Sequence, residues 1–164
     1  MRIIAVDPGY ERLGIAIMDK ERKPLDKTRG LRETVIFSEC FRTPKELPHS
    51  DRLVMVGKEI ERVIDEYKPK ALSIETLFFA KNQKTALLVA EARGVILYAA
   101  RAKGLSVKEY MPNQIKIAVT SYGKSDKQQM MAMIPKIVEL KQALRHDDEY
   151  DAIAAGITYF AIER

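Results

Sequence analysis

The sequence predicts an α/β domain built on one five-stranded mixed sheet with helices on both faces. Three observations support this fold class. Short β-branched runs dominate residues 2–41, helical periodicity then alternates with short apolar runs, and no internal repeat or low-complexity segment interrupts the pattern. With 164 residues, 46% hydrophobic and 31% charged, the chain has the size and composition of one compact unit. We therefore expect residues 1–164 to form a single domain.

The first three expected strands follow one another directly. A β-branched run over residues 2–7 stops at Pro8-Gly9, and a second apolar run covers residues 13–18. A third strand is expected over residues 33–41. The tight turn makes the opening an antiparallel meander. Residues 20–32 form a basic connector, which is interpreted as a solvated hairpin loop in preference to a nucleic-acid contact.

Helices alternate with strands in the remainder of the chain. Apolar residues recur at helical spacing over residues 53–67, which predicts an amphipathic helix with Ser50 or Asp51 as its N-cap and an end before Pro69. The later elements are expected as a buried strand over 71–74, a long helix over 85–103 ended by Gly104, a strand over 107–110, a short helix begun at Pro112, a helix from Ser125 or Asp126 to Pro135, and a closing helix over 148–163, with residues 136–145 ambiguous. This order is that of the ribonuclease H-like fold.

Four acidic residues should converge in such a fold. Asp7 ends the first strand and Glu75 ends the fourth, so both carboxylates emerge at one sheet edge if these strands are parallel neighbours. Asp148 and Asp151 share one face of the first turn of the closing helix. Like charges packed together repel unless cations lie between them, and oxygen ligands favour Mg²⁺ or Mn²⁺. Two such ions can activate water and stabilise the departing oxygen of a phosphodiester, which is nuclease chemistry.

These acidic residues also have other interpretations. Most acids in a chain with 23 of them are solvated, and an acidic pair in a first turn usually complements the helix dipole. Zinc chemistry is improbable because Cys40 is the single cysteine and only two histidines are present. An Asp followed by a glycine turn also opens the nucleotide-binding lobe of sugar kinases and actin-like ATPases. The chain is too short for two lobes and has no Gly-x-x-x-x-Gly-Lys loop, which disfavours ATP binding.

The chain resembles the RuvC-type Holliday junction resolvases over nearly its whole length. The most specific match is Glu75 followed by Thr-Leu-Phe-Phe-Ala-Lys-Asn. The other matching blocks, in order and spacing, are Asp7-Pro-Gly, Ala92-Arg93-Gly94-Val95 and Asp148-Glu-Tyr-Asp151-Ala-Ile-Ala.

The resemblance implies a homodimeric, divalent-metal-dependent endodeoxyribonuclease of homologous recombination and DNA repair. Such an enzyme binds a four-way junction and nicks two strands of like polarity symmetrically, leaving a 3′ hydroxyl and a 5′ phosphate. Its metal-binding and catalytic carboxylates would be Asp7, Glu75, Asp148 and Asp151, with Mg²⁺ as the cofactor and Mn²⁺ as a substitute. A branch-migration motor complex of the RuvA and RuvB type is an implied partner.

The resemblance also implies residues that contact DNA. Phe78 would approach bases at the crossover, and the alternative is plain core packing. Lys127 would neutralise charge that develops on the scissile phosphate, and Lys116 maps to the same phosphate-binding region. Without the resemblance, a solvated surface would be the default for each lysine. The remaining expected DNA contacts are Lys81, Asn82, Lys84 and Lys124.

Several features leave alternatives open. The helix over 85–103 is apolar on more than one side, which fits either a central buried helix or, by resemblance, part of a dimer interface. His146 is either an outer-sphere helper at the metal site or a solvated loop residue. Ser121 stands where the family often has glycine, and the connector over 20–32 is longer than usual. Both departures concern loop geometry and junction preference and remove no catalytic residue.

Two other functions compete with junction cleavage. One is that of the related RuvX-like ribonucleases acting on ribosomal RNA precursors, which share the Asp-x-Gly start. The other is a junction-binding module that does not cut, which would tolerate loss of an acid. The net charge of +5 permits a polyanionic partner. No run is long and apolar enough for a membrane span or signal-peptide core, so we expect no membrane partner and a cytoplasmic location.

Overall fold

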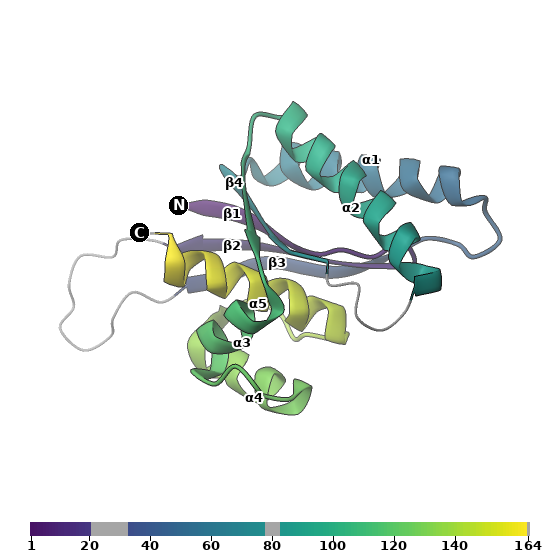
Figure 1. The fold of residues 1–164 in the computed structure, drawn as a ribbon. Helices are drawn as coiled ribbons and strands as arrows, with labels where there is room; N and C mark the ends of the chain where they lie inside the picture. The colour runs from purple at the N-terminus through teal and green to yellow at the C-terminus, as the bar shows by residue number, and fades with distance from the viewer. Residues whose placement is uncertain (21–32, 78–82, 164) are drawn as a thin grey trace.

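The computed structural model describes residues 1–20, 33–77 and 83–163. In these residues six strands form one sheet in the order β5-β4-β1-β2-β3-β6 (Figure 1). Strands β1 to β3 form the predicted antiparallel meander, and β4 and β5 extend it in parallel from β1. The bounds are β1 (Arg2–Asp7), β2 (Arg12–Lys20), β3 (Glu33–Arg42), β4 (Ala71–Glu75), β5 (Ser106–Tyr110) and β6 (Glu139–Leu140).

The sixth strand corrects the predicted count of five. Strand β6 has two residues and pairs in parallel with β3, where Thr34 lies opposite Glu139 and Val35 opposite Leu140. It falls in the segment 136–145 whose pattern was ambiguous. Two residues are too few to show an alternating pattern, so pairing across the sheet determines this strand and local sequence preference does not.

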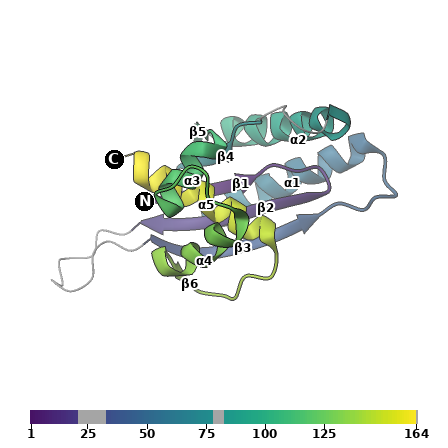
Figure 2. The same ribbon diagram turned by 60° about the horizontal axis from the view of Figure 1, so that its bottom comes forward.

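Helices cover both faces of the sheet, as predicted (Figures 1 and 2). Helices α1 and α2 pack on one face, and α5 crosses the other, with α3 and α4 beside it. Of the described helices, none is long and apolar enough to cross a membrane. The bounds are α1 (His49–Tyr67), α2 (Gln83–Ala102), α3 (Pro112–Thr120), α4 (Lys127–Ile137) and α5 (Asp147–Ile162).

Prolines change two predicted helix boundaries. Helix α1 is capped by Pro48, not by Ser50 or Asp51, and the carbonyl of Pro48 accepts the first backbone amide bonds. The fixed φ of proline prepares the chain for the first helical turn without a side-chain cap. Helix α4 continues through Pro135 to Ile137, because a proline so near the end removes little of the hydrogen-bond ladder. Its start agrees with one predicted cap: the side chain of Asp126 accepts a bond from the amide of Gln129 at 2.8 Å.

Small residues bring α5 unusually close to the sheet. Side chains of β1 alternate, so that Ala5 lies under α5 while its neighbours face α1 and α2. A Cβ added at Gly156 of α5 would overlap the sulfur of Met18 in β2 and crowd Ala5. A Cβ added at Gly14 of β2 would overlap the backbone carbonyl of Asp148. Since Gly14 pairs with Asp7, this contact places the start of α5 next to the end of β1.

Candidate active site

Two carboxylates meet where β1 and β4 end. Asp7 is the last residue of β1 and Glu75 the last of β4. The strands are adjacent and parallel, with Val6 opposite Ile74, so both side chains emerge at the same sheet edge. They line a shared cavity of about 220 Å³. The structure therefore has β1 and β4 as parallel neighbours, as predicted, with both carboxylates at one sheet edge.

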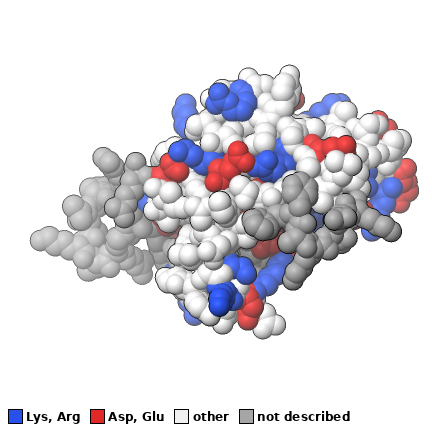
Figure 3. Space-filling model, viewed as in Figure 1, with Lys and Arg blue, Asp and Glu red and all other residues white. Residues whose placement is uncertain are grey.

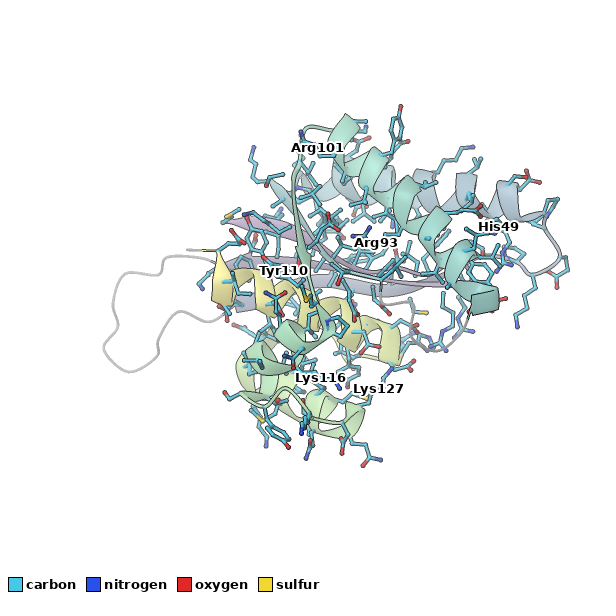
Figure 4. The ribbon with its side chains drawn as sticks, viewed as in Figure 1. His49, Arg93, Arg101, Tyr110, Lys116 and Lys127 are labelled. Carbon is cyan, nitrogen blue, oxygen red and sulfur yellow. The ribbon has the colours of Figure 1, made fainter. Side chains whose placement is uncertain are left out.

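The first turns of α5 bring further acids to this edge. The backbone of Asp148 lies against Gly14, the cross-strand partner of Asp7. Asp151 and Glu75 both line a second cavity, of about 250 Å³, together with Lys116 and Lys127. Figure 4 shows these two lysines on α3 and α4, on the same side of α5. One carboxylate, that of Glu75, thus belongs to both cavities and links them.

The basic side chains Lys127 and Arg12 pair with the acids of α5. Lys127 Nζ donates to Asp147 Oδ2 at 2.8 Å and to Asp151 Oδ2 at 2.9 Å. Arg12 Nη2 donates to Asp147 Oδ1 at 2.7 Å and also contacts Asp148 Oδ2. The acids of α5 therefore hold the positively charged side chains of Lys127 and Arg12 at the start of this helix, where the helix dipole alone would favour anions.

Burial and mutual repulsion raise the pKa values of the clustered acids. The pKa of Asp7 lies well above its ordinary value, chiefly because the carboxyl is buried and then because Asp151 and Glu75 are nearby anions. Burial followed by the charge of Asp151 raises the pKa of Glu75. Burial also raises the pKa of Asp151, against the opposing effect of Lys127. The charge of Asp151 thus raises the pKa values of both Asp7 and Glu75, as expected for carboxylates that share one site.

The pKa of Asp7 predicts a gain in stability from Asp7→Asn. A carboxyl whose pKa is raised by folding loses stability as the pH rises through that folded value, because the ionised form is the one that folding disfavours. An amide does not ionise, so the variant should escape this loss. We expect its melting temperature, measured with a chelator present, to exceed that of the wild type by a few degrees at neutral and alkaline pH. For a chain of this size, each kcal/mol of added stability raises the melting temperature by about 2–4 °C. The gain should shrink as the pH falls toward the ordinary pKa.

Thermal denaturation across a pH series measures this effect. The matched control is Asp65→Asn, because Asp65 forms an exposed ion pair with Lys103 at 2.6 Å, remote from the site. Its loss should not stabilise the fold. Equal melting temperatures for wild type and Asp7→Asn at alkaline pH would show that burial and the neighbouring acids do not destabilise the ionised form of Asp7.

The donor chemistry of this edge fits a hard divalent cation. Asp7, Glu75 and Asp151 offer carboxylate oxygens, the ligands that Mg²⁺ prefers. Among the described residues, no three acidic, histidine or cysteine side chains stand close enough together to hold a metal ion as they are placed. Mg²⁺ does not need such a cage, since it keeps several waters and usually takes one or two carboxylates together with substrate phosphates. The residues therefore fit magnesium better than any ion that demands a closed protein shell.

Some predicted site residues lie apart or cannot be placed. Lys124 is exposed in the loop between α3 and α4, outside both cavities. His146 is the N-cap of α5 and is partly buried, and its amide donates to Glu149 Oε1 at 3.1 Å. Phe78, Lys81 and Asn82, with most of the connector over 20–32 and the side chain of Lys84, lie outside what the structure describes.

The structure adds residues that sequence reasoning did not assign to the site. Asp147 and Arg12 belong to it through their contacts with Lys127 and Asp148. Arg93 of α2 donates from Nε to the carbonyl of Glu75 at 3.2 Å and also contacts Glu109, which ties α2 to the end of β4 (Figure 4). The signal for Arg93 was its position in a matched block, whereas nothing in the local pattern singles out Arg12.

Comparison with known proteins identifies the family. The family model described as "Crossover junction endodeoxyribonuclease RuvC" matches residues 3–159. The chain belongs to the RuvC family. It is 41% identical over 156 residues to the crossover junction endodeoxyribonuclease RuvC of Thermosipho melanesiensis, covering 95% of this chain and 94% of that protein. It is 36% identical over 159 residues to the RuvC of Fusobacterium nucleatum, covering 97% of this chain and 80% of the relative.

Solved RuvC structures share the fold. The RuvC of Thermus thermophilus superimposes with a TM-score of 0.85 at 28% identity and covers 98% of this chain and 93% of that one. A structure of the same protein in complex with Holliday junction substrate gives a TM-score of 0.83 at 26% identity, covering 99% and 97% of the two chains. The predicted ribonuclease H-like class is confirmed. As a RuvC family member the protein is an endodeoxyribonuclease, and it belongs to a metal-dependent group of hydrolases.

Proposed function

We propose that this protein resolves four-way DNA junctions by paired symmetric nicks, in homologous recombination and DNA repair. The observation that carries the proposal is the convergence of Asp7 and Glu75 at one sheet edge, with Asp151 of α5 lining the adjoining cavity that also contains Glu75. A RuvC structure in complex with Holliday junction substrate supports the choice of DNA. One domain of residues 1–164 would carry this activity.

The proposed chemistry is hydrolysis of a phosphodiester with water as nucleophile. Asp7, Glu75, Asp148 and Asp151 would hold Mg²⁺, for which Mn²⁺ can substitute, and the metal would activate water and stabilise the departing oxygen. Asp7 and Glu75 would hold the metal at the ends of β1 and β4. Lys127 presents its ammonium to the cavity that Asp151 and Glu75 line, where it can offset charge on the phosphate.

The proposed DNA contacts surround the carboxylates. Lys116 lines the same cavity as Glu75 and Asp151 and can bind the backbone on that side. The face seen in Figure 3 mixes basic and acidic side chains, so contacts to DNA depend on particular lysines and not on a uniform positive field. Phe78 would stack on a base at the crossover. The other proposed contacts are Lys81, Asn82, Lys84 and Lys124.

A homodimer is part of the proposal, because paired nicks need two sites. Helix α2 exposes Tyr98 at 74% and Leu87 at 65%, and Val54 of α1, in the same helical layer, is 54% exposed. Large apolar side chains left in solvent on packed helices are typical of a surface that another subunit covers. A second copy of the chain is the occupant we propose. A motor complex of the RuvA and RuvB type would deliver the junction.

Cleavage of matched substrates tests this function. Purified protein with Mg²⁺ should nick a labelled four-way junction in two strands of like polarity, and duplex DNA of matched length should stay largely intact. Structured RNA of the same length should also survive. The expected products carry a 3′ hydroxyl and a 5′ phosphate, which ligation of the nicked product verifies. A preference for RNA would favour the RuvX-like alternative, and tight binding with no cleavage would favour the non-cutting module. The comparisons support neither.

A further inference from the structure

Five charged groups at the start of α5 form an alternating chain of acids and bases. Asp151 accepts from Lys127, which also donates to Asp147, and Asp147 in turn accepts from Arg12. Arg12 completes the chain at Asp148. The bases come from β2 and α4, and the acids from α5, so three elements are joined. The central member, Asp147, is one that neither the pattern nor the family motif assigns to the site.

Both carboxylate oxygens of Asp147 are in use. Oδ1 accepts from Arg12 at 2.7 Å and Oδ2 accepts from Lys127 at 2.8 Å. The hydrogen bond from Lys127, followed by its charge and the bond from Arg12, holds the pKa of Asp147 well below its ordinary value. Asp147 lines neither of the cavities that contain Asp7 and Glu75. Its contacts are those of a side chain that holds a base and not those of a ligand.

Lys127 has two anchors of different kinds. Asp151 lines the cavity beside Glu75 and is a proposed metal ligand, whereas Asp147 lies one turn earlier on the same face of α5 and lines neither cavity. If the oxygens of Asp151 were taken by a metal, Lys127 would still have Asp147 as its partner. A lysine has a long flexible stem with many rotamers, so an unanchored ammonium would spend much of its time away from the phosphate.

Arg12 fixes the direction in which Asp147 points. It lies at the start of β2, whose backbone is locked into the meander by pairing with β1 and β3. By taking Oδ1, Arg12 leaves Oδ2 directed toward Lys127. Asp147 and its arginine partner are each exposed by more than 40%, so their ion pair contributes little to stability. Its role is to fix the orientation of the Asp147 carboxylate.

We propose that Asp147 is a positioning residue that holds Lys127 beside the scissile phosphate. This inference rests on the proposed function, in which Lys127 offsets charge on that phosphate. Asp147 itself touches neither metal nor DNA and acts through the lysine. Its removal should therefore slow the chemical step while leaving junction affinity and the Mg²⁺ requirement unchanged.

Single-turnover cleavage of a four-way junction tests the proposal in the full chain. We expect Asp147→Asn to lower the rate at saturating Mg²⁺ on the order of tenfold, because small misplacements of a catalytic group cost one to two orders of magnitude. Asp147→Glu, which keeps the charge, should recover part of the rate. The junction dissociation constant and the Mg²⁺ concentration for half-maximal rate should match those of the wild type.

A double-mutant cycle separates positioning from other roles. In a Lys127→Met background the Asp147→Asn change should have no further effect, since the group that it positions is gone. Asp65→Asn, which breaks an exposed Asp–Lys pair far from the site, is the matched control and should cleave at the wild-type rate.

Each contrary outcome has a distinct meaning. An unchanged rate for Asp147→Asn, or an equal rate loss with and without Lys127, would overturn the positioning role while cleavage by the wild type still upholds the proposed function. A large rise in the Mg²⁺ requirement would overturn it as well, by making Asp147 a ligand. Absence of junction cleavage by the wild type would instead refute the proposed function.

Discussion

An Asp7→Asn variant is expected to bind a four-way junction about as tightly as the wild type while its cleavage rate falls by about 10³-fold or more. Asp7 is the partly buried carboxylate at the end of β1, and its neighbours at the sheet edge are acids. An amide has the same shape but lacks the charge that a divalent cation needs. The lysines that contact the DNA backbone are unaltered, so the salt-sensitive part of binding should persist.

Parallel measurements of cleavage and of binding without metal test this separation. The control is again Asp65→Asn, which removes one carboxylate from the surface and none from the site. The same Asp7→Asn protein should melt at a higher temperature than the wild type at neutral pH, because the amide does not ionise among the neighbouring acids. A variant that loses binding and cleavage to the same extent would show that Asp7 serves the fold or the DNA surface, and not the chemistry.

The second large effect is expected from Gly14→Ala. A Cβ at Gly14 would overlap the backbone carbonyl of Asp148, and a backbone atom cannot turn aside as a side chain can. The first turn of α5 would have to move away from β2 and carry Asp148 and Asp151 with it. We expect the free energy of unfolding to fall by about 1–3 kcal/mol, the usual cost of overpacking, and cleavage to fall well beyond what that loss explains.

Denaturant unfolding and junction cleavage, measured at a temperature where the variant stays folded, separate these two effects. Gly156→Ala is the matched control, because its new methyl group would overlap only the sulfur of Met18, part of a flexible side chain, and would otherwise crowd Ala5 by a few tenths of an ångström. It should cost less stability and leave the acids of α5 in place. Full cleavage by folded Gly14→Ala would mean that the position of α5 over β2 does not matter for the site.

Much of the site could be predicted because its acids stand at ends of regular elements. Asp7 and Glu75 each terminate a short buried strand, and the end of a strand is visible in the hydrophobic pattern. Asp148 and Asp151 precede an apolar helical run, so their common face was also visible. The motifs of the RuvC family then fixed which acids to combine, something that spacing alone left open.

The features that the sequence pattern did not predict depend mostly on contacts between segments distant in the chain. Arg12 and Asp147 lie far apart in sequence and form an ion pair only once β2 and α5 have packed. The pairing of β6 with β3 and the cap at Pro48 likewise follow from tertiary placement and from a fixed proline φ, neither of which has a periodic signature. Charged residues on a basic, acid-rich chain offer too many possible pairs for the pattern to choose one.

The close packing of α5 on β1 and β2 has a consequence for the timing of activity in the cell. Helix α5 covers one face of the sheet and also carries Asp148 and Asp151 of the proposed site, so a nascent chain that ends before α5 would lack both this cover and these two carboxylates. Such a nascent polypeptide can expose lysines to DNA but has no complete hydrolytic centre. The proposed hydrolytic centre would therefore be complete only after α5 has docked on the sheet.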